Sequence, residues 1–363
     1  MMRIRYIICL LAICIAYYEV LVACALAADT VPQRASIVTG ASGYIGREVV
    51  HCLLQDSSSS NQHKIYCLVR PSRVEDERNY WGRKSDSVSV MPYDMTDGGK
   101  TIREALKAAY NTDGEEPGDD SEIDACVYHV ASNFGPTEDH AQTAIDNVQG
   151  AEDLVNSVAE FKKCRLVLTS SMAAVRGTGQ EPQNREFYTH EDWNTLSKLG
   201  ANWGSSYQWS KAESERRAWE LAEEKGIPMT SLCPSFVFGP PSDGIMSGSY
   251  SITLVGQWAR GESPVQSRLC VDIRDIARAH VAAATNPAAI GQRYIVSKEE
   301  RVSSKEMADA LKRVCRESGL GNAEKITFDS EFSGGAIPIG NKEVESLDRL
   351  KELGVSLRSV DET

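Results

Sequence analysis

The sequence predicts an α/β fold in which helices cover both faces of a doubly wound parallel sheet, with a smaller mixed lobe at the C-terminal end. Two observations predict this fold class. Apolar runs alternate with amphipathic helical patterns between residues 34 and 238. The runs are also apolar throughout, as in strands that are buried on both faces, rather than alternately apolar and polar.

Six strands and four helices account for this alternation. The predicted strands are Ala35–Thr39, Lys64–Val69, Ser87–Met91, Ala125–Val130, Arg165–Ser170 and Met229–Pro234. The predicted helices are Ile45–Gln55, Lys100–Tyr110, His140–Glu160 and Ser206–Lys225. In such a sheet the crossovers are right-handed, and a ligand site is expected at the carboxyl ends of the strands.

The first predicted strand leads directly into a glycine-rich turn, Gly40-Ala-Ser-Gly43-Tyr-Ile-Gly46. Gly40 permits the sharp exit from the strand, Gly43 lets the backbone approach a pyrophosphate, and Gly46 lets the next helix pack closely. The free N–H groups at the start of that helix attract phosphate. The spacing differs from the common G-x-G-x-x-G of dinucleotide-binding loops. Its position after the first strand nevertheless indicates a Rossmann-type, NAD(P)-binding domain over residues 34–238.

The stretch Tyr207-Gln-Trp-Ser-Lys211 places a phenol beside an ammonium, because residues four apart share one face of a helix. A free tyrosine has a pKa of about 10, and a nearby positive charge is expected to lower that pKa. The result is a general acid or base suited to a carbonyl or an alcohol. A long helix can supply Y-x-x-x-K by chance, so its significance depends on the glycine turn and on Ser170-Ser171, which ends a predicted strand.

Together these stretches resemble the extended short-chain dehydrogenase/reductases, in particular the branch of dihydroflavonol, cinnamoyl-CoA and yeast-type ketoaldehyde reductases. The similarity runs in family order from about residue 35 to the C-terminus. The matching stretches are Thr39-Gly-Ala-Ser-Gly-Tyr-Ile-Gly46, Val127-Tyr-His-Val-Ala-Ser132, Leu168-Thr-Ser-Ser171, Glu191-Asp-Trp-Asn194, Tyr207-Gln-Trp-Ser-Lys-Ala-Glu213, Pro234-Ser-Phe-Val-Phe-Gly-Pro240 and Val271-Asp-Ile-Arg-Asp-Ile-Ala-Arg-Ala-His280.

The resemblance implies three catalytic residues. Tyr207 would protonate the carbonyl oxygen, and Lys211 would orient the nicotinamide ribose and tune the tyrosine. Ser171 would hydrogen-bond the substrate oxygen, with Ser170 as the alternative. The histidines invite a metal interpretation, but no His, Cys and Asp cluster has zinc-like spacing, and His129 fits core packing better.

The resemblance also implies a set of cofactor-binding residues. In addition to Tyr207 and Lys211, these residues are Gly40, Ser42, Gly43, Tyr44, Ile45, Gly46, Arg70, Asp94, Met95, Val130, Ala131, Ser132, Pro234 and Val237. Asn147 matches a family position near the fourth strand, and satisfying backbone groups is an equal explanation for it.

Arg70 directly follows the second predicted strand. Enzymes of this shape that use NAD tend to carry an acidic residue there, whereas an arginine offers a planar cation to a 2′-phosphate. NADPH (NADP+) is therefore the preferred cofactor, and NAD stays open because Glu75 and Asp76 lie close to Arg70 and Arg73.

Residues 239–363 are expected to form the substrate-binding lobe. By resemblance, segments near 269–284 and 292–296 should return to the main sheet. Relatives usually continue into one more helix after a stretch like Lys351-Glu-Leu-Gly354, so part of this lobe is expected to be missing.

The N-terminus carries a separate signal. Residues 6–28 are almost wholly apolar, follow two arginines and end in Ala25-Leu-Ala27, so residues 1–28 are predicted to be a signal peptide or membrane anchor. This predicts entry into the secretory pathway or an organelle, with membrane association through residues 6–28. The rest is cytosol-like, with seven cysteines after that segment and no Asn-x-Ser/Thr sequon. A fluorescent fusion that stays diffusely cytosolic would exclude the signal.

The sequence therefore predicts an NADPH-dependent reductase of an aldehyde or ketone, acting on a small-molecule carbonyl substrate. The alternatives are an NAD-dependent nucleotide-sugar epimerase or dehydratase, a sterol-type dehydrogenase, and a non-catalytic protein that senses its cofactor. A net charge of −12 without a basic stripe argues against nucleic acid as a partner. No feature identifies the carbonyl substrate or the oligomeric state.

Overall fold

The computed structural model describes residues 34–56, 63–110, 124–183, 186–244, 249–319, 321–329 and 342–363. The predicted signal or anchor, residues 1–28, lies outside these ranges. Within them, every helix is too short or too polar to cross a bilayer.

The main sheet has seven strands in the order β3-β2-β1-β4-β5-β6-β9, and all neighbouring strands are parallel. The strands are β1 (Arg34–Thr39), β2 (Lys64–Val69), β3 (Val88–Pro92), β4 (Asp124–His129), β5 (Cys164–Thr169), β6 (Met229–Pro234) and β9 (Arg293–Val296). The predicted α/β class is confirmed, and the predicted strands are displaced by at most one residue at either end. The chain winds outward in both directions from β1 and β4, so a crevice forms at their carboxyl ends.

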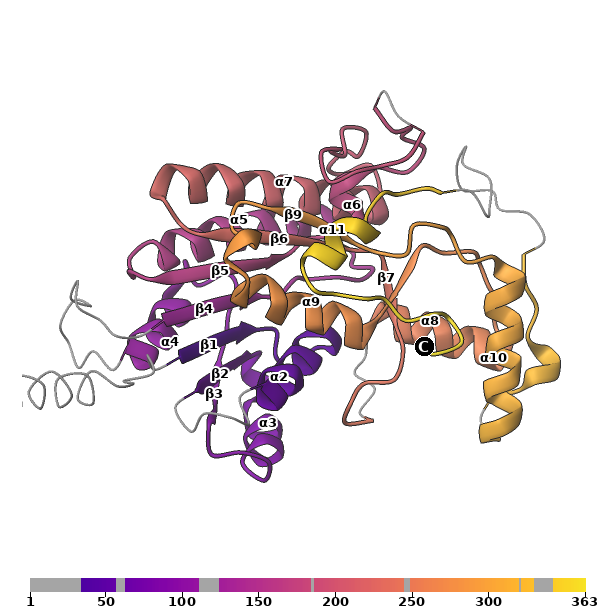
Figure 1. Cartoon of the computed structure of the whole chain (residues 1–363), viewed down its shortest axis with the longest axis horizontal. Coiled ribbons are helices and arrows are strands. Elements are labelled where there is room, and N and C mark those ends of the chain that lie inside the picture. The colour runs from indigo at the N-terminus through magenta and orange to yellow at the C-terminus, as the bar shows by residue number, and fades with distance from the viewer. Residues whose placement is uncertain are drawn as a thin grey trace, which may run out of the picture.

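Helices cover both faces of this sheet (Figure 1). On one face lie α2 (Tyr44–Asp56) and α9 (Ile273–Thr285), and on the other lie α4 (Lys100–Tyr110), α5 (His140–Val158) and α7 (Trp203–Lys225). Neighbouring residues of a strand point to opposite faces, so Ile37 and Val38 of β1 pack in two different cores. This is why the strand sequences are apolar throughout.

Two short helices were not predicted. Helix α3 (Val74–Trp81) follows the 3-10 turn η2 (Pro71–Arg73), and α6 (Met172–Val175) follows β5. The sequence of α3 is mostly charged, and only Glu77 and Trp81 in it are buried, so it lacks the apolar stripe that marks a helix.

The C-terminal lobe lies at one end of the molecule in Figure 1. It contains α8 (Tyr250–Arg260), α10 (Ser304–Ser318), the 3-10 turn η4 (Ala323–Lys325) and a small parallel sheet of β7 (Phe236–Phe238) and β8 (Cys270–Asp272). Trp258, Val265 and Met307 belong to its own core. The 3-10 turn η3 (Pro287–Ala289) precedes β9, and α11 (Leu347–Glu352) packs against β9.

The two segments that were expected to return to the main sheet behave differently. Strand β9 lies in that sheet beside β6. The expectation was wrong for β8, which pairs with β7 because Val237 and Val271 bring the two short strands into register. Only the following helix, α9, returns, and it packs on α2.

Helix α2 also holds the turn at residues 239–244. The Tyr44 hydroxyl donates to the Gly239 carbonyl, and the Glu48 carboxylate accepts from the Ser242 N–H at 2.8 Å. The helix that follows the glycine turn is thereby joined to the entrance of the C-terminal lobe.

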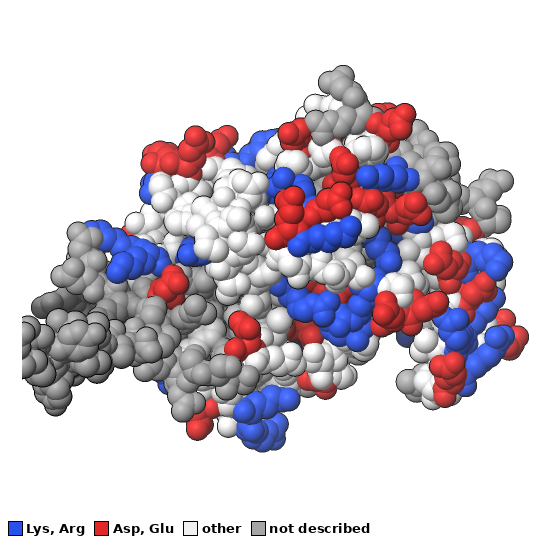
Figure 2. All heavy atoms as spheres, in the orientation of Figure 1, with Lys and Arg blue, Asp and Glu red and all other residues white. Residues whose placement is uncertain are grey.

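The charged surface gives no sign of a polyanion-binding face on the side that Figure 2 draws. Lysines and arginines alternate there with aspartates and glutamates, and no continuous basic stripe crosses the elements in view. This face therefore lacks the clustered positive charge that nucleic-acid binding requires.

Candidate active site

The glycine turn after β1 is as tight as the sequence suggests. Gly40 has a positive φ of 68°, and a Cβ there would lie 3.0 Å from the backbone of Ala131. The Gly43 N–H donates to the Gly40 carbonyl at 2.8 Å, and a Cβ on Gly46 would lie only 2.3 Å from the same oxygen. Added side chains would fill this crevice, so the backbone geometry suits the close approach of a pyrophosphate.

The end of β4 is fixed to the end of β1 through Thr39. Its hydroxyl accepts from the N–H groups of Val130 and Ala131, each at 3.1 Å, and lies 2.9 Å from His129 Nδ1. Burial, and secondly the charge of Lys211, lowers the pKa of His129 to about 3. His129 is therefore a neutral core residue, and no group of three metal-ligating side chains occurs in the described ranges.

Two buried hydroxyls in this region have no hydrogen-bond partner within the described part of the chain. They belong to Ser132, which follows β4, and to Ser235, which lies between β6 and β7. Since a buried hydroxyl normally has a partner, both suit a polar ligand, and a dinucleotide offers amide, ribose and phosphate groups. Ser235 lies within the predicted stretch from Pro234 to Val237, although only the two end residues of that stretch were named as cofactor-binding residues.

The other predicted cofactor residues are spread along the carboxyl edge of the sheet. Ser42 and Ile45 are half-buried in the glycine turn, and Val130 and Ala131 are half-buried after β4. Tyr44 is buried and directed to Gly239, so only its backbone is open to a phosphate.

Pro234 and Val237 are both buried, and Val237 belongs to the hydrophobic core beside its strand partner Val271. The Asp94 carboxylate accepts from the N–H and hydroxyl of Thr96, which lowers its pKa and holds the turn after β3. The Met95 side chain packs against Gly150 of α5.

Arg70 is exposed directly after β2, and no ion pair engages its guanidinium among the described residues. Arg73, in contrast, lies 3.7 Å from Asp76 and 3.5 Å from Glu77. Asp76 and Glu77 are therefore matched by Arg73, and Glu75 accepts from Asn79 Nδ2 at 3.4 Å, which leaves Arg70 for a phosphate.

The three predicted catalytic side chains come together beyond the end of β5. Ser171 caps α6 by accepting from the Ala173 N–H at 3.1 Å, and its side chain is near enough to the Tyr207 phenol on α7 to lower the pKa of that phenol. One turn further along α7, Lys211 Nζ donates to the Thr169 carbonyl at 3.2 Å. The Lys211 ammonium is thus held at the strand end, beside the crevice.

The expected lowering of the Tyr207 pKa was wrong. Burial raises the pKa of Tyr207 to about 12, and the interaction with Ser171 only partly opposes it. Lys211 is directed to Thr169 instead, and burial lowers its own pKa to about 8, against the charge of Glu215. At neutral pH Tyr207 is therefore a proton donor beside a mostly protonated lysine.

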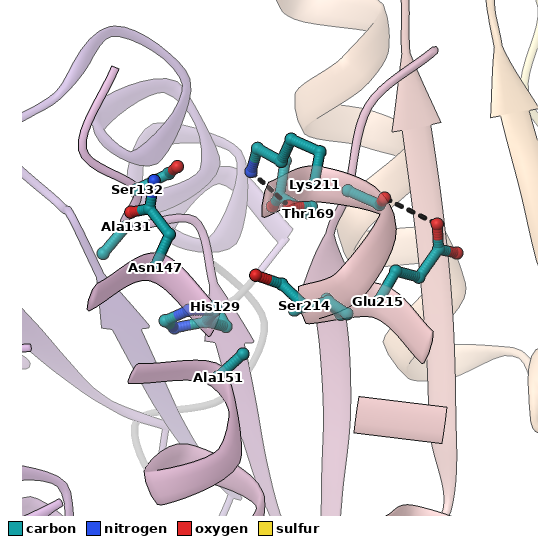
Figure 3. Close-up of a pocket in the computed structure, with 11 residues that line it drawn as sticks. His129, Ala131, Ser132, Asn147, Ala151, Thr169, Lys211, Ser214 and Glu215 are labelled. Carbon is teal, nitrogen blue, oxygen red and sulfur yellow. Dashed lines mark hydrogen bonds between the residues drawn. The ribbon is translucent and has the colours of Figure 1, made fainter. Parts of the chain in front are cut away.

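A small pocket lies behind Lys211, between α5 and α7 (Figure 3). Ser132 and Asn147 face it from one side, and Lys211 and Glu215 belong to the other. Asn147 accepts from the Asn133 N–H at 2.9 Å and donates to its carbonyl at 3.0 Å, so it satisfies backbone groups. It thereby fixes the loop that carries Phe134.

The Tyr207 ring belongs to a cluster of four aromatic rings, and its other three members were not predicted from the sequence. Phe134 lies 4.4 Å from the Tyr207 ring, 5.7 Å from Trp203 and 5.4 Å from Tyr250, measured between centroids. Phe134 is 44% exposed and Tyr250 is 40% exposed. We call these four residues the aromatic cluster. They come from three separate segments, so no sequence pattern joins them.

The site combines a glycine turn between the first strand and helix with a serine, a tyrosine and a lysine that converge beside it. Together these features define a class of protein. The class is that of the Rossmann-fold oxidoreductases that use a nicotinamide dinucleotide. A family model described as "NAD dependent epimerase/dehydratase family" matches residues 36–297, and the chain belongs to this family.

Relatives place the chain among the reductases of this family, as the resemblance implied. It is 32% identical to cinnamoyl-CoA reductase 1 of Arabidopsis thaliana over 276 residues, which is 73% of this chain and 70% of the relative. It is 28% identical to an NADPH-dependent methylglyoxal reductase of Saccharomyces cerevisiae, over 76% of this chain and 80% of the relative. The fold matches the yeast methylglyoxal/isovaleraldehyde reductase with a TM-score of 0.73 and 24% identity, over 91% of this chain and 95% of the other.

Proposed function

We propose that this chain is an NADPH-dependent reductase of aldehydes or ketones, and that its substrates carry an apolar, preferably aromatic, group beside the carbonyl. The observation that carries the proposal is the convergence of Ser171, Tyr207 and Lys211 beside the glycine crevice, with the aromatic cluster around the phenol. The names of the Arabidopsis and yeast relatives, both carbonyl reductases, support the reaction class.

When bound, the nicotinamide supplies a hydride to the carbonyl carbon. The Tyr207 hydroxyl gives its proton to the carbonyl oxygen, so that an alcohol forms and a phenolate is left on the enzyme. The Ser171 hydroxyl donates a hydrogen bond to the same oxygen as negative charge develops there. The Lys211 ammonium lies one turn from the phenolate and stabilises its charge until a proton returns from solvent.

The choice of NADPH rests on Arg70. Its exposed guanidinium has no carboxylate partner in the described ranges, and it lies where the adenosine ribose is expected, at the carboxyl end of β2. A guanidinium matches the geometry of a phosphate, whereas it offers nothing specific to two ribose hydroxyls. The yeast reductase that shares the fold was solved with NADPH, which supports the same choice.

Replacing Arg70 with Ala should therefore raise the KM for NADPH about 10- to 100-fold, because a charge-assisted hydrogen bond to the 2′-phosphate is lost. The KM for NADH should stay unchanged. Arg73→Ala is the matched control, because Arg73 already pairs with Asp76 and Glu77 and should change the KM much less. Steady-state kinetics with both cofactors measure this. A wild-type preference for NADH would overturn the assignment.

The substrate class rests on the aromatic cluster. Exposed apolar side chains are common singly. Here, however, exposed Phe134 contacts the candidate proton donor and exposed Tyr250 contacts Phe134, so the two rings form a surface on which an apolar substituent can pack. Such a surface would hold the group attached to the carbonyl while the oxygen reaches Tyr207 and Ser171. NADPH consumption across a panel of aromatic, aliphatic and dicarbonyl substrates tests the proposal. Purification with tightly retained NAD would favour the epimerase alternative, and no NADPH consumption with any substrate would favour the non-catalytic protein that senses its cofactor.

Within that panel, Phe134→Ala should raise the KM for aromatic aldehydes about tenfold and change the KM for small dicarbonyls little, because only the larger substrates reach the ring. Val314→Ala, which truncates an exposed apolar side chain on α10 away from the site, is the control and should change neither value. Equal effects of Phe134→Ala on all substrates would contradict a role in selecting them.

A further inference from the structure

Glu215 and Arg293 form a buried ion pair near the site, and neither side chain takes part directly in the reaction. Glu215 is on α7, one turn after Lys211, and is fully buried. Its carboxylate accepts from Arg293 Nε at 2.8 Å and Nη2 at 3.0 Å, and from the hydroxyls of Ser170 at 2.7 Å and Ser231 at 2.6 Å. Glu215 thus joins the catalytic helix to β9, β6 and the end of β5.

Arg293 extends this network to the loop before α7. Its Nη1 donates to the carbonyls of His190 at 2.8 Å and Asp192 at 2.6 Å, and its guanidinium lies 3.9 Å from the centre of the Trp193 ring. Every element that carries a catalytic residue is therefore connected to one buried ion pair.

Stability alone is a poor explanation for such a pair. Removing two charges from water costs several kcal/mol for each ion, and apolar residues of similar volume often stabilise a core equally well. The pair does have a geometric connection to the reaction, because Ser170 precedes Ser171. Adjacent residues of an extended segment point to opposite sides, so fixing the Ser170 hydroxyl on Glu215 fixes the direction in which Ser171 points toward Tyr207.

The second connection is electrostatic. Glu215 and Lys211 both line the pocket between α5 and α7 (Figure 3), and Glu215 is the main charge that favours the ammonium form of Lys211 against burial. Burial raises the pKa of Cys233 on β6 to about 12, so this thiol is neutral where Lys211 titrates, and His129 on β4 is neutral as well. Among the described residues, Glu215 is the carboxylate that pairs with the Arg293 guanidinium of β9.

We propose that Glu215, held by Arg293, is a positioning residue for carbonyl reduction: it orients Ser171 through Ser170 and supplies the counter-charge for the Lys211 ammonium. This inference deepens the proposed function and depends on it. Glu215 touches neither the substrate nor the dinucleotide, so its effect should appear in kcat and in the pH profile rather than in cofactor affinity.

The test is Glu215→Gln in the full chain, which keeps the shape and one acceptor oxygen but removes the charge. We expect kcat for reduction to fall about 10- to 100-fold because the serine is less well directed. We also expect the alkaline limb of the kcat profile, which reflects loss of the Lys211 proton, to move down by about one pH unit from its wild-type position. The affinity for NADPH, measured by fluorescence titration, should be unchanged.

A second variant covers the case in which the single substitution leaves Arg293 uncompensated and the chain fails to fold. Glu215→Leu combined with Arg293→Met removes both charges, which should restore a folded, NADPH-binding protein with low kcat. The corresponding change at the buried pair of Arg301 and Glu343 is the control. Because Glu343 also pairs with Arg176 at 2.8 Å, this control combines Arg301→Met, Glu343→Leu and Arg176→Met, and it should leave kcat unchanged.

Two results would overturn the inference alone: Glu215→Gln with wild-type kcat and pH profile, or the charge-free double variant with wild-type kcat. The latter would make the pair structural. A wild-type chain that reduces no carbonyl would instead overturn the proposed function, and this inference with it.

Discussion

Replacing Tyr207 with Phe should abolish carbonyl reduction, with kcat falling about 1000-fold or more, because it removes the proton that the product alcohol requires. The ring remains, so the packing against Phe134 and Trp203 is kept. The hydroxyl lost is the one that interacts with Ser171, and an interaction of this kind is worth about 1 kcal/mol of unfolding free energy. The variant should therefore fold and bind NADPH like the wild type.

Single-turnover kinetics and a fluorescence titration of NADPH separate these two results. The matched control is Tyr250→Phe, which removes a hydroxyl from the same aromatic cluster but from a ring that has no role in proton transfer. If Tyr207→Phe kept most of the activity, another group would have to protonate the carbonyl. The assignment of Ser171 and Lys211 would then fall as well, since both are assigned through the phenol.

The fold was predictable because its signals are local. Each central strand is a short apolar run whose neighbouring residues, such as Ile37 and Val38, pack in cores on opposite faces of the sheet. The glycine turn was equally readable, since Gly40 needs its positive φ and Gly46 has no room for a side chain. The four predicted helices, including α7 with Tyr207 and Lys211 one turn apart, are present with small differences at their ends.

What the sequence did not reveal depends on tertiary contacts. The pKa of Tyr207 is set by burial and by the direction of Lys211 toward Thr169, neither of which the i, i+4 spacing specifies. The pairing of β8 with β7 depends on a register between two three-residue strands. Charge alone could not identify Glu215 either, because its partner Arg293 is distant in sequence and meets it only in the folded chain.

The aromatic cluster illustrates the same limit for specificity. Trp203 lies one turn before Tyr207 on α7, whereas Phe134 and Tyr250 belong to two other segments that the fold brings to this helix. Each of them is unremarkable in its own sequence context. The reaction class can thus be predicted from short motifs in the sequence. The substrate class depends on side chains that are distant in the sequence and meet only in the folded chain.

Replacing Gly46 with Ala should be the most damaging small change to cofactor binding. Gly46 has an ordinary helical backbone, so the effect is purely steric: the new methyl would lie 2.3 Å from the Gly40 carbonyl oxygen and 2.8 Å from its carbon. Either the turn or the helix must move by about 1 Å, and a displacement of that size can cost about 100-fold in a positioned site. The overpacking itself should lower the free energy of unfolding by about 1–3 kcal/mol.

A fluorescence titration with NADPH measures the loss of cofactor affinity. Urea unfolding measures the loss of stability separately. Gly256→Ala on α8 is the matched control, since its methyl would meet only the mobile end of Arg260, at 3.1 Å. It should leave NADPH binding unchanged and raise stability by up to about 1 kcal/mol through helix propensity. If Gly46→Ala bound NADPH as tightly as the wild type, the crevice at Gly40 would not be the place where the dinucleotide phosphates lie. The inferred position of the nicotinamide would then have no support. The roles assigned to Tyr207 and Ser171, which depend on that position, would have no support either.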